Sequence, residues 1–206
     1  MRSKVGPMWI IYIPRKQVEA ELPGPDGMSL WEKANNWLAH KIPAKLKAED
    51  ILCTPAKLPE VTSDETVYLL PGITAPGETG AEWPHDRNRI SFNQMADQII
   101  NAGLPPDFAG SLKVYCSHGA EGIDTSPSFV KRFADEMVRR GYAKCSIYGY
   151  LGKLTLDYVN SSSSDPAQRA QFATASALLD QGWHRYSMDA TSGNYSRRAK
   201  DAKVRF

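Results

Sequence analysis

The chain has 206 residues, of which 42% are hydrophobic and 23% charged, a composition typical of a soluble globular protein. Its formal net charge of +2 is too small to predict binding to nucleic acid or to an anionic membrane. A chain of this length is predicted to form one domain, residues 1–206, with its own hydrophobic core.

The cysteines and short motifs exclude further classes. Three cysteines, at positions 53, 116 and 145, are too few for a disulfide scaffold, and no C-x-x-C spacing predicts a metal site. The G-x-G-x-x-G and Walker A patterns are absent, so no cofactor is expected. No apolar run has the length of a signal peptide or a membrane span. We therefore expect a cytoplasmic protein, or one exported without a classical signal peptide.

The first half of the chain predicts strands separated by long connectors. Met8–Ile13 is apolar and β-branched, which is typical of a strand buried on both faces. A helix is expected from Ser29, with Glu32 at the capping-box spacing, and Pro43 ends it. The further elements expected before residue 102 are a short strand near 51–53, a strand at 67–70, a long loop at 74–88 and a helix at 91–101.

The second half predicts a strand–helix–strand unit. We expect a strand at 112–116, a helix at 127–140 capped by Ser126, and a strand at 145–151. Such a crossover makes the two strands parallel neighbours. Beyond it, the pattern predicts a polar loop at 161–164, a helix at 166–179 and an edge strand at 202–206.

One stretch combines reactive side chains with turn residues. The strand at 112–116 ends in Cys116, which His118 and Gly119 follow closely. A thiol at the carboxyl end of a strand, near a helix N-terminus, is in a setting that lowers its pKa. A nucleophilic cysteine needs a base, and the candidates are His85, in the loop after the preceding strand, and His118. The alternative is that Cys116 is a small core residue and His118 a turn residue.

The segment Val114-Tyr115-Cys116-Ser117-His118-Gly119-Ala120-Glu121-Gly122 resembles the strand-then-Ser-His-Gly segment of caspase-like cysteine peptidases. This group includes self-cleaving protease domains of large bacterial toxins. The resemblance covers residues 67 to 152. It implies a three-layer α/β/α sandwich with a mostly parallel sheet. It also implies a cysteine hydrolase that cleaves peptides and belongs to a bacterial accessory or effector type.

Two registers of this resemblance are possible, and each lacks half of the dyad. In the family a His-Gly follows one parallel strand and the nucleophilic cysteine follows the next. If His118-Gly119 is the His-Gly, the nucleophile should stand near Tyr150, where there is no thiol. If Cys116 is the nucleophile, the His-Gly should follow the strand at 67–70, where the chain reads Pro71-Gly72-Ile73-Thr74. The second register places the 74–88 loop where substrate would bind.

The candidate site therefore has a catalytic part and a binding part. Cys116 would attack, His85 or His118 would act as the base, and amides near Gly119 would hold the oxyanion. The residues expected to contact a peptide are Gly119, Trp83, Asp86 and Asp124. Two alternatives stay open. One is a non-catalytic interaction module that binds a protein through the loop at 72–90. The other is a binder of small anions at the carboxyl edge of the sheet.

Overall fold

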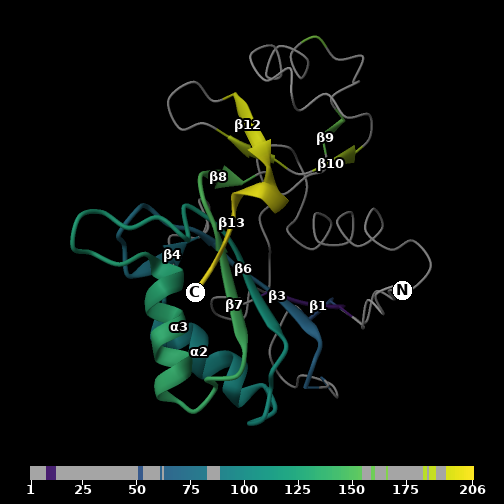
Figure 1. The fold of residues 1–206 in the computed structure, drawn as a ribbon, viewed down its shortest axis with the longest axis vertical. Coiled ribbons are helices and arrows are strands. Elements are labelled where there is room, and N and C mark those ends of the chain that lie inside the picture. Colours follow the sequence, from purple (N-terminus) through teal and green to yellow (C-terminus); the bar gives the residue numbers. More distant parts are fainter. Residues whose placement is uncertain are drawn as a thin grey trace.

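The structure is a computed structural model, and it describes residues 8–12, 51–52, 61, 63–82, 89–154, 159–160, 166, 183–184, 186–188 and 194–206. The expected helices at 29–43 and 166–179 lie largely or wholly outside these residues, as do Cys53 and the loop at 161–164. Within the described part, strands and helices form an α/β fold (Figure 1).

The central sheet and its helices contain most of the described residues. In chain order these elements are β1 (Met8–Tyr12), β2 (Ile51–Leu52), β3 (Thr66–Ile73), β4 (Gly80–Glu82), β5 (Arg89–Ser91), α2 (Phe92–Asn101), β6 (Ser111–Ser117), α3 (Phe129–Arg139), β7 (Ser146–Tyr150) and β13 (Lys203–Arg205). The shorter elements are β8 (Lys153–Leu154), β9 (Val159–Asn160), β10 (Trp183–His184), β11 (Tyr186–Met188), β12 (Tyr195–Arg198) and the 3-10 helix η3 (Ala199–Ala202).

The six strands of the main path lie in the order β13-β7-β6-β3-β1-β2. The pairs β1–β2, β1–β3, β3–β6 and β6–β7 are parallel, which confirms the expected crossover, whereas β13 pairs antiparallel with β7. The sheet is therefore mixed, and β13 confirms the edge strand predicted at 202–206. In an open sheet of this kind, ligands bind outside the carboxyl ends of the parallel strands.

Helices α2 and α3 pack side by side against one face of the sheet (Figure 1). Alternate strand residues point toward the helices because successive side chains of a strand face opposite sides. These residues, together with the apolar stripe of each helix, form the core: Val67, Leu69, Leu112, Val114, Cys116 and Ile147 from the strands, and Met95, Ile99, Phe129, Phe133 and Met137 from the helices. The other face carries Tyr68, Leu70, Tyr115 and Tyr150, which are also buried.

Two predicted boundaries differ from the structure. The segment expected to be a loop at 74–88 contains β4, which pairs with β5 in an antiparallel hairpin that continues from β3. Helix α3 begins after Ser128, whose hydroxyl caps Lys131 N–H at 3.2 Å, and not after Ser126. The hydroxyl of Ser126 instead donates to the Gly77 carbonyl at 2.9 Å, so this serine holds the preceding loop. No described helix is long and apolar enough to cross a membrane.

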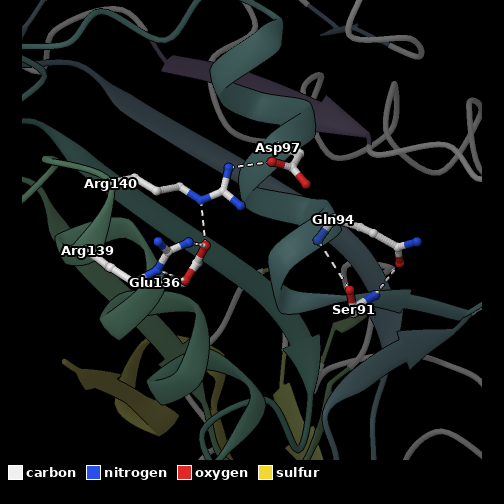
Figure 2. A network of polar contacts seen from close by, with 6 residues as sticks. All are labelled: Ser91, Gln94, Asp97, Glu136, Arg139 and Arg140. Carbon is white, nitrogen blue, oxygen red and sulfur yellow. Dashed lines mark hydrogen bonds and ion pairs between the residues drawn. The ribbon is translucent and has the colours of Figure 1, made fainter.

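A polar network joins the two helices (Figure 2). Glu136 on α3 is buried and accepts hydrogen bonds from the guanidinium groups of Arg139 and Arg140. Arg140 also reaches across to Asp97 on α2. These hydrogen bonds, first from Arg139 and then from Arg140, lower the pKa of Glu136 from 4.5 to about 2. Through Arg140, the Glu136 carboxylate is thus linked to Asp97 on α2.

Replacing Glu136 by Gln is expected to lower the free energy of unfolding at pH 7 by about 2 kcal/mol, because the guanidinium groups lose their shared carboxylate. The pKa of this carboxyl is lower in the folded protein than in the unfolded chain. The ionised carboxyl therefore makes its full contribution to the free energy of unfolding above pH 4.5, and this contribution is lost as the pH falls toward 2. Urea unfolding of both proteins at neutral pH and at about pH 3 measures the difference, which should narrow at the lower pH.

Asp135→Asn is the matched control for this prediction. The Asp135 side chain is 62% exposed and pairs only across one helical turn with Lys131, so its loss should change the free energy of unfolding by less than about 0.5 kcal/mol. Equal destabilisation by the two substitutions, or a difference between wild type and Glu136→Gln that does not depend on pH, would contradict the role given to Glu136.

Candidate functional site

The candidate site lies at the carboxyl end of β6, where the strand turns sharply into a loop. His118 adopts a left-handed backbone conformation with φ of 57°, which ends the strand. Gly119 follows, and a Cβ added there would lie 3.1 Å from both the Cys116 carbonyl oxygen and Val130 Cγ2. Glycine at this position therefore lets the first turn of α3 pack directly against the end of β6.

Cys116 points into the core and not into the site. Its exposed fraction is 0%, and its thiol lies 3.6 Å from the Ser117 carbonyl oxygen. Leu112 and Val114, at alternate positions of the same strand, belong to the same hydrophobic core. The other described thiol, Cys145, donates to the Tyr142 carbonyl at 3.1 Å, and burial raises its pKa to about 11. Both cysteines are therefore packed in or against the hydrophobic core.

His118 forms a clip that ties the β6 loop to the turn after β7. Its side chain is 19% exposed, and its Nδ1 lies 3.0 Å from Oε2 of Glu121. The other oxygen of Glu121 accepts the backbone N–H of Gly152. The backbone N–H of His118 in turn donates to the Gly152 carbonyl at 2.9 Å. We refer to His118, Glu121 and Gly152 as the edge clip.

Backbone amides of the loop are engaged within the protein. Gly119 N–H donates to the Cys116 carbonyl at 3.1 Å, and Ala120 N–H donates to the Tyr150 carbonyl at 3.0 Å. The N–H of Glu121 donates to the His118 carbonyl at 3.0 Å. Because these three N–H groups donate to backbone carbonyls, they are not available to hold a substrate oxygen or an anion in this arrangement. The Glu121 carboxylate in the same turn would also repel an anion.

The loop beyond the clip presents exposed side chains at its tip. Ile123 and Ser126 form an isolated bridge, and Asp124 between them has φ of 46°. Asp124 is exposed, and Ile123 is 52% exposed despite being apolar. The Gly77 loop packs against this bridge, with Gly77 N–H donating to the Glu121 carbonyl at 2.9 Å. The tip is therefore exposed but held on one side.

The segment directly after β3, the strand beside β6 in the sheet, contributes Thr74 to this edge. Thr74 N–H donates to the Ser117 carbonyl at 3.2 Å, and its hydroxyl donates to the Gly80 carbonyl at 2.8 Å. Thr74 thus stands in the segment where the second register would require a His-Gly. Of the other expected site residues, Trp83, His85 and Asp86 lie outside the described residues.

The structure thus places His118, Gly119 and Asp124 on one loop, with Cys116 beneath it. Sequence reasoning did not identify Glu121 as the partner of His118, although the His-x-x-Glu spacing within a glycine-rich turn could have indicated it. Within the described part of the chain, no group of three or more His, Cys, Asp or Glu side chains could hold a metal ion. Comparison with protein families, curated proteins and solved structures finds no match to this chain.

Proposed function

We propose that this protein is a non-catalytic α/β domain of caspase-like architecture that binds a protein partner through the loops at the carboxyl edge of its sheet. The observation that carries the proposal is the complete burial of Cys116 in the hydrophobic core. A cysteine nucleophile must be reached by its substrate, and it acts as a thiolate, which a hydrophobic core disfavours.

The neighbouring residues support the same conclusion. Strands β3 and β6 are parallel neighbours, the relation that the family requires of its His-Gly strand and its cysteine strand. The segment after β3, however, carries Thr74 where a histidine would be needed, and His118 pairs with Glu121. The loop amides that would form an oxyanion hole donate to backbone carbonyls. Among the described residues, these contacts support a binding role over a catalytic one.

The binding surface that we propose is the tip of the 122–126 loop. Ile123 supplies an exposed apolar side chain and Asp124 an exposed carboxylate, a combination suited to an apolar anchor beside a polar contact. The edge clip and the Gly77 contact hold the base of the loop. A partner would therefore meet a preformed surface and lose little entropy in ordering it.

The test uses peptides selected from a phage-displayed random library on the immobilised protein, with their affinities measured by fluorescence anisotropy. Ile123→Ser should weaken binding by about tenfold or more, as expected for loss of an apolar anchor. Val138→Ser is the matched control, because Val138 is 55% exposed but lies near the other end of α3. Its substitution should leave affinity within about twofold.

The same peptides also test for catalysis. Mass spectrometry after long incubation should show intact peptide with the wild type and with Cys116→Ala. Cleavage by the wild type that Cys116→Ala abolishes would instead establish a cysteine hydrolase. Peptide binding that does not respond to Ile123→Ser would remove the loop tip as the binding surface.

A further inference from the structure

A second surface lies at the edge of the sheet, on β13. In the described part of the sheet, β13 is the terminal strand of the main path and pairs only with β7. Phe206 N–H donates to the Ile147 carbonyl and Leu151 N–H to the Ala202 carbonyl, both at 2.9 Å. In an antiparallel pair, the backbone N–H and C=O groups of every second residue bond to the partner strand. The backbone groups of the residues between them are directed to the opposite side. The N–H and C=O groups of Lys203 and Arg205 therefore point away from β7.

The side chains of β13 have a regular pattern. Lys203 and Arg205 are exposed and lie on the sheet face that carries Tyr148, with Lys203 Nζ 4.7 Å from the Tyr148 ring centroid. The Arg205 guanidinium donates to the Ser146 hydroxyl at 3.0 Å. Val204 and Phe206 are partly buried, and Phe206 packs against the core on the other side. The edge thus alternates cationic and apolar positions.

The cation at this edge ends a row that crosses the sheet. Tyr68 of β3 lies opposite Lys113 of β6, Lys113 lies opposite Tyr148 of β7, and Tyr148 lies opposite Arg205. Lys113 Nζ is 5.0 Å from the Tyr68 ring centroid. Aromatic and cationic residues therefore alternate along the row, and none of the described strands occupies the next position, beyond Arg205. A carboxylate at that position would meet a cation directly.

We propose that β13 binds an extended acidic segment of a partner protein, which joins the sheet as an additional strand. The edge of β13 presents both N–H donors and C=O acceptors. A peptide backbone can hydrogen-bond to both kinds of group, whereas the phosphate groups of a nucleic acid can bond only to the donors. Acidic side chains at alternate positions would face Lys203 and Arg205, and apolar ones would face Val204 and Phe206. A second copy of the chain is disfavoured, because edge-to-edge pairing would bring like charges together.

The probe is a fluorescein-labelled, capped heptapeptide that alternates glutamate and valine, titrated with the full chain and followed by anisotropy. Arg205→Pro removes an outward N–H and one charge, whereas Arg205→Ala removes the charge alone. Proline is tolerated at an edge strand when its missing N–H faces outward, and the residue before it, Val204, is extended. The proline variant should bind about tenfold more weakly than the alanine variant, which reflects the lost backbone hydrogen bond.

Charge reversal gives a second measurement that does not depend on the proline variant folding. Lys203→Glu combined with Arg205→Glu should abolish binding of the glutamate peptide and allow binding of its lysine counterpart. Equal affinities for the two peptides with the wild type would overturn the proposal, as would equal affinities of the Arg205→Pro and Arg205→Ala proteins. Tighter binding of a single-stranded decanucleotide than of the glutamate peptide would identify the edge as a nucleic-acid surface and would also overturn it. These measurements test β13 alone, so their outcome does not depend on whether Ile123 binds a partner or Cys116 is catalytic.

Discussion

In the folded protein, iodoacetamide is expected to modify Cys116 at least about 1,000-fold more slowly than in the urea-unfolded chain, because the thiol becomes accessible only when the core opens. The slow reaction is expected because Cys116 is completely buried in the hydrophobic core, together with Leu112 and Val114. The rate is measured by peptide mapping and mass spectrometry, which follow each cysteine separately. Cys116 labelling should accelerate with urea in parallel with global unfolding.

Cys145 provides an internal comparison with a different cause of slow reaction. It is only partly buried, but burial raises its pKa to about 11, so its rate should rise about tenfold per pH unit between pH 7 and 10. If Cys116 instead reacts faster than Cys145 in the native protein, with a pH midpoint below that of an ordinary thiol, then the thiol is accessible and activated. That result would reject the non-catalytic proposal and favour a cysteine hydrolase.

Gly110→Ala is expected to destabilise the protein by at least about 3 kcal/mol, at the upper end of overpacking effects. Gly110 is buried at the start of β6, and an added Cβ would lie 2.1 Å from the Glu65 carbonyl oxygen and 2.7 Å from the Phe108 ring. That carbonyl accepts the N–H of Ser111, and the Gly110 carbonyl accepts the N–H of Ser146. Moving the backbone to make room would therefore disturb β3, β6 and β7 together. Urea unfolding measures the loss.

Gly141→Ala is the matched control, because it adds the same methyl group at a position where no atom of the described residues, apart from the chain neighbours, lies within 4 Å. Gly141 has φ of +96°, so alanine there costs about 1–2 kcal/mol from backbone strain alone. A Gly110→Ala protein as stable as Gly141→Ala would show that the start of β6 can shift without loss, contrary to the close packing described above.

Much of the fold could be predicted because local patterns and long-range packing agree. The apolar run at Met8–Tyr12 forms the strand that it predicts, and the apolar stripe of α2 and the β6–α3–β7 unit bury the faces that their sequence periods predict. The β4–β5 hairpin was missed because its strands are three residues each and its sequence is rich in glycine and polar residues. The α3 boundary was misplaced because Ser126 and Ser128 flank Pro127 and either could cap. In the structure the Ser126 hydroxyl donates to the Gly77 carbonyl, and Ser128 is the residue that caps the helix.

The candidate site was harder to predict than the fold. The position of Cys116 among alternating apolar residues of β6 already indicated a core side chain, and the structure places it there. The Glu121 contact depends on the left-handed turn at His118, and the Gly152 contact depends on the neighbouring strand, so neither is visible in local periodicity. The expectation of a mostly parallel sheet holds for β2, β1, β3, β6 and β7, whereas β13 and the β4–β5 hairpin are antiparallel and make the sheet mixed.

The edge clip has a consequence for the rate of recognition. Because Glu121 joins His118 to Gly152, displacing the loop at the end of β6 would break contacts to the turn after β7 at the same time. The loop should therefore keep one conformation with and without a ligand. A ligand of Ile123 would then bind in a single step whose observed rate rises linearly with ligand concentration, without the plateau that a preceding rearrangement would impose.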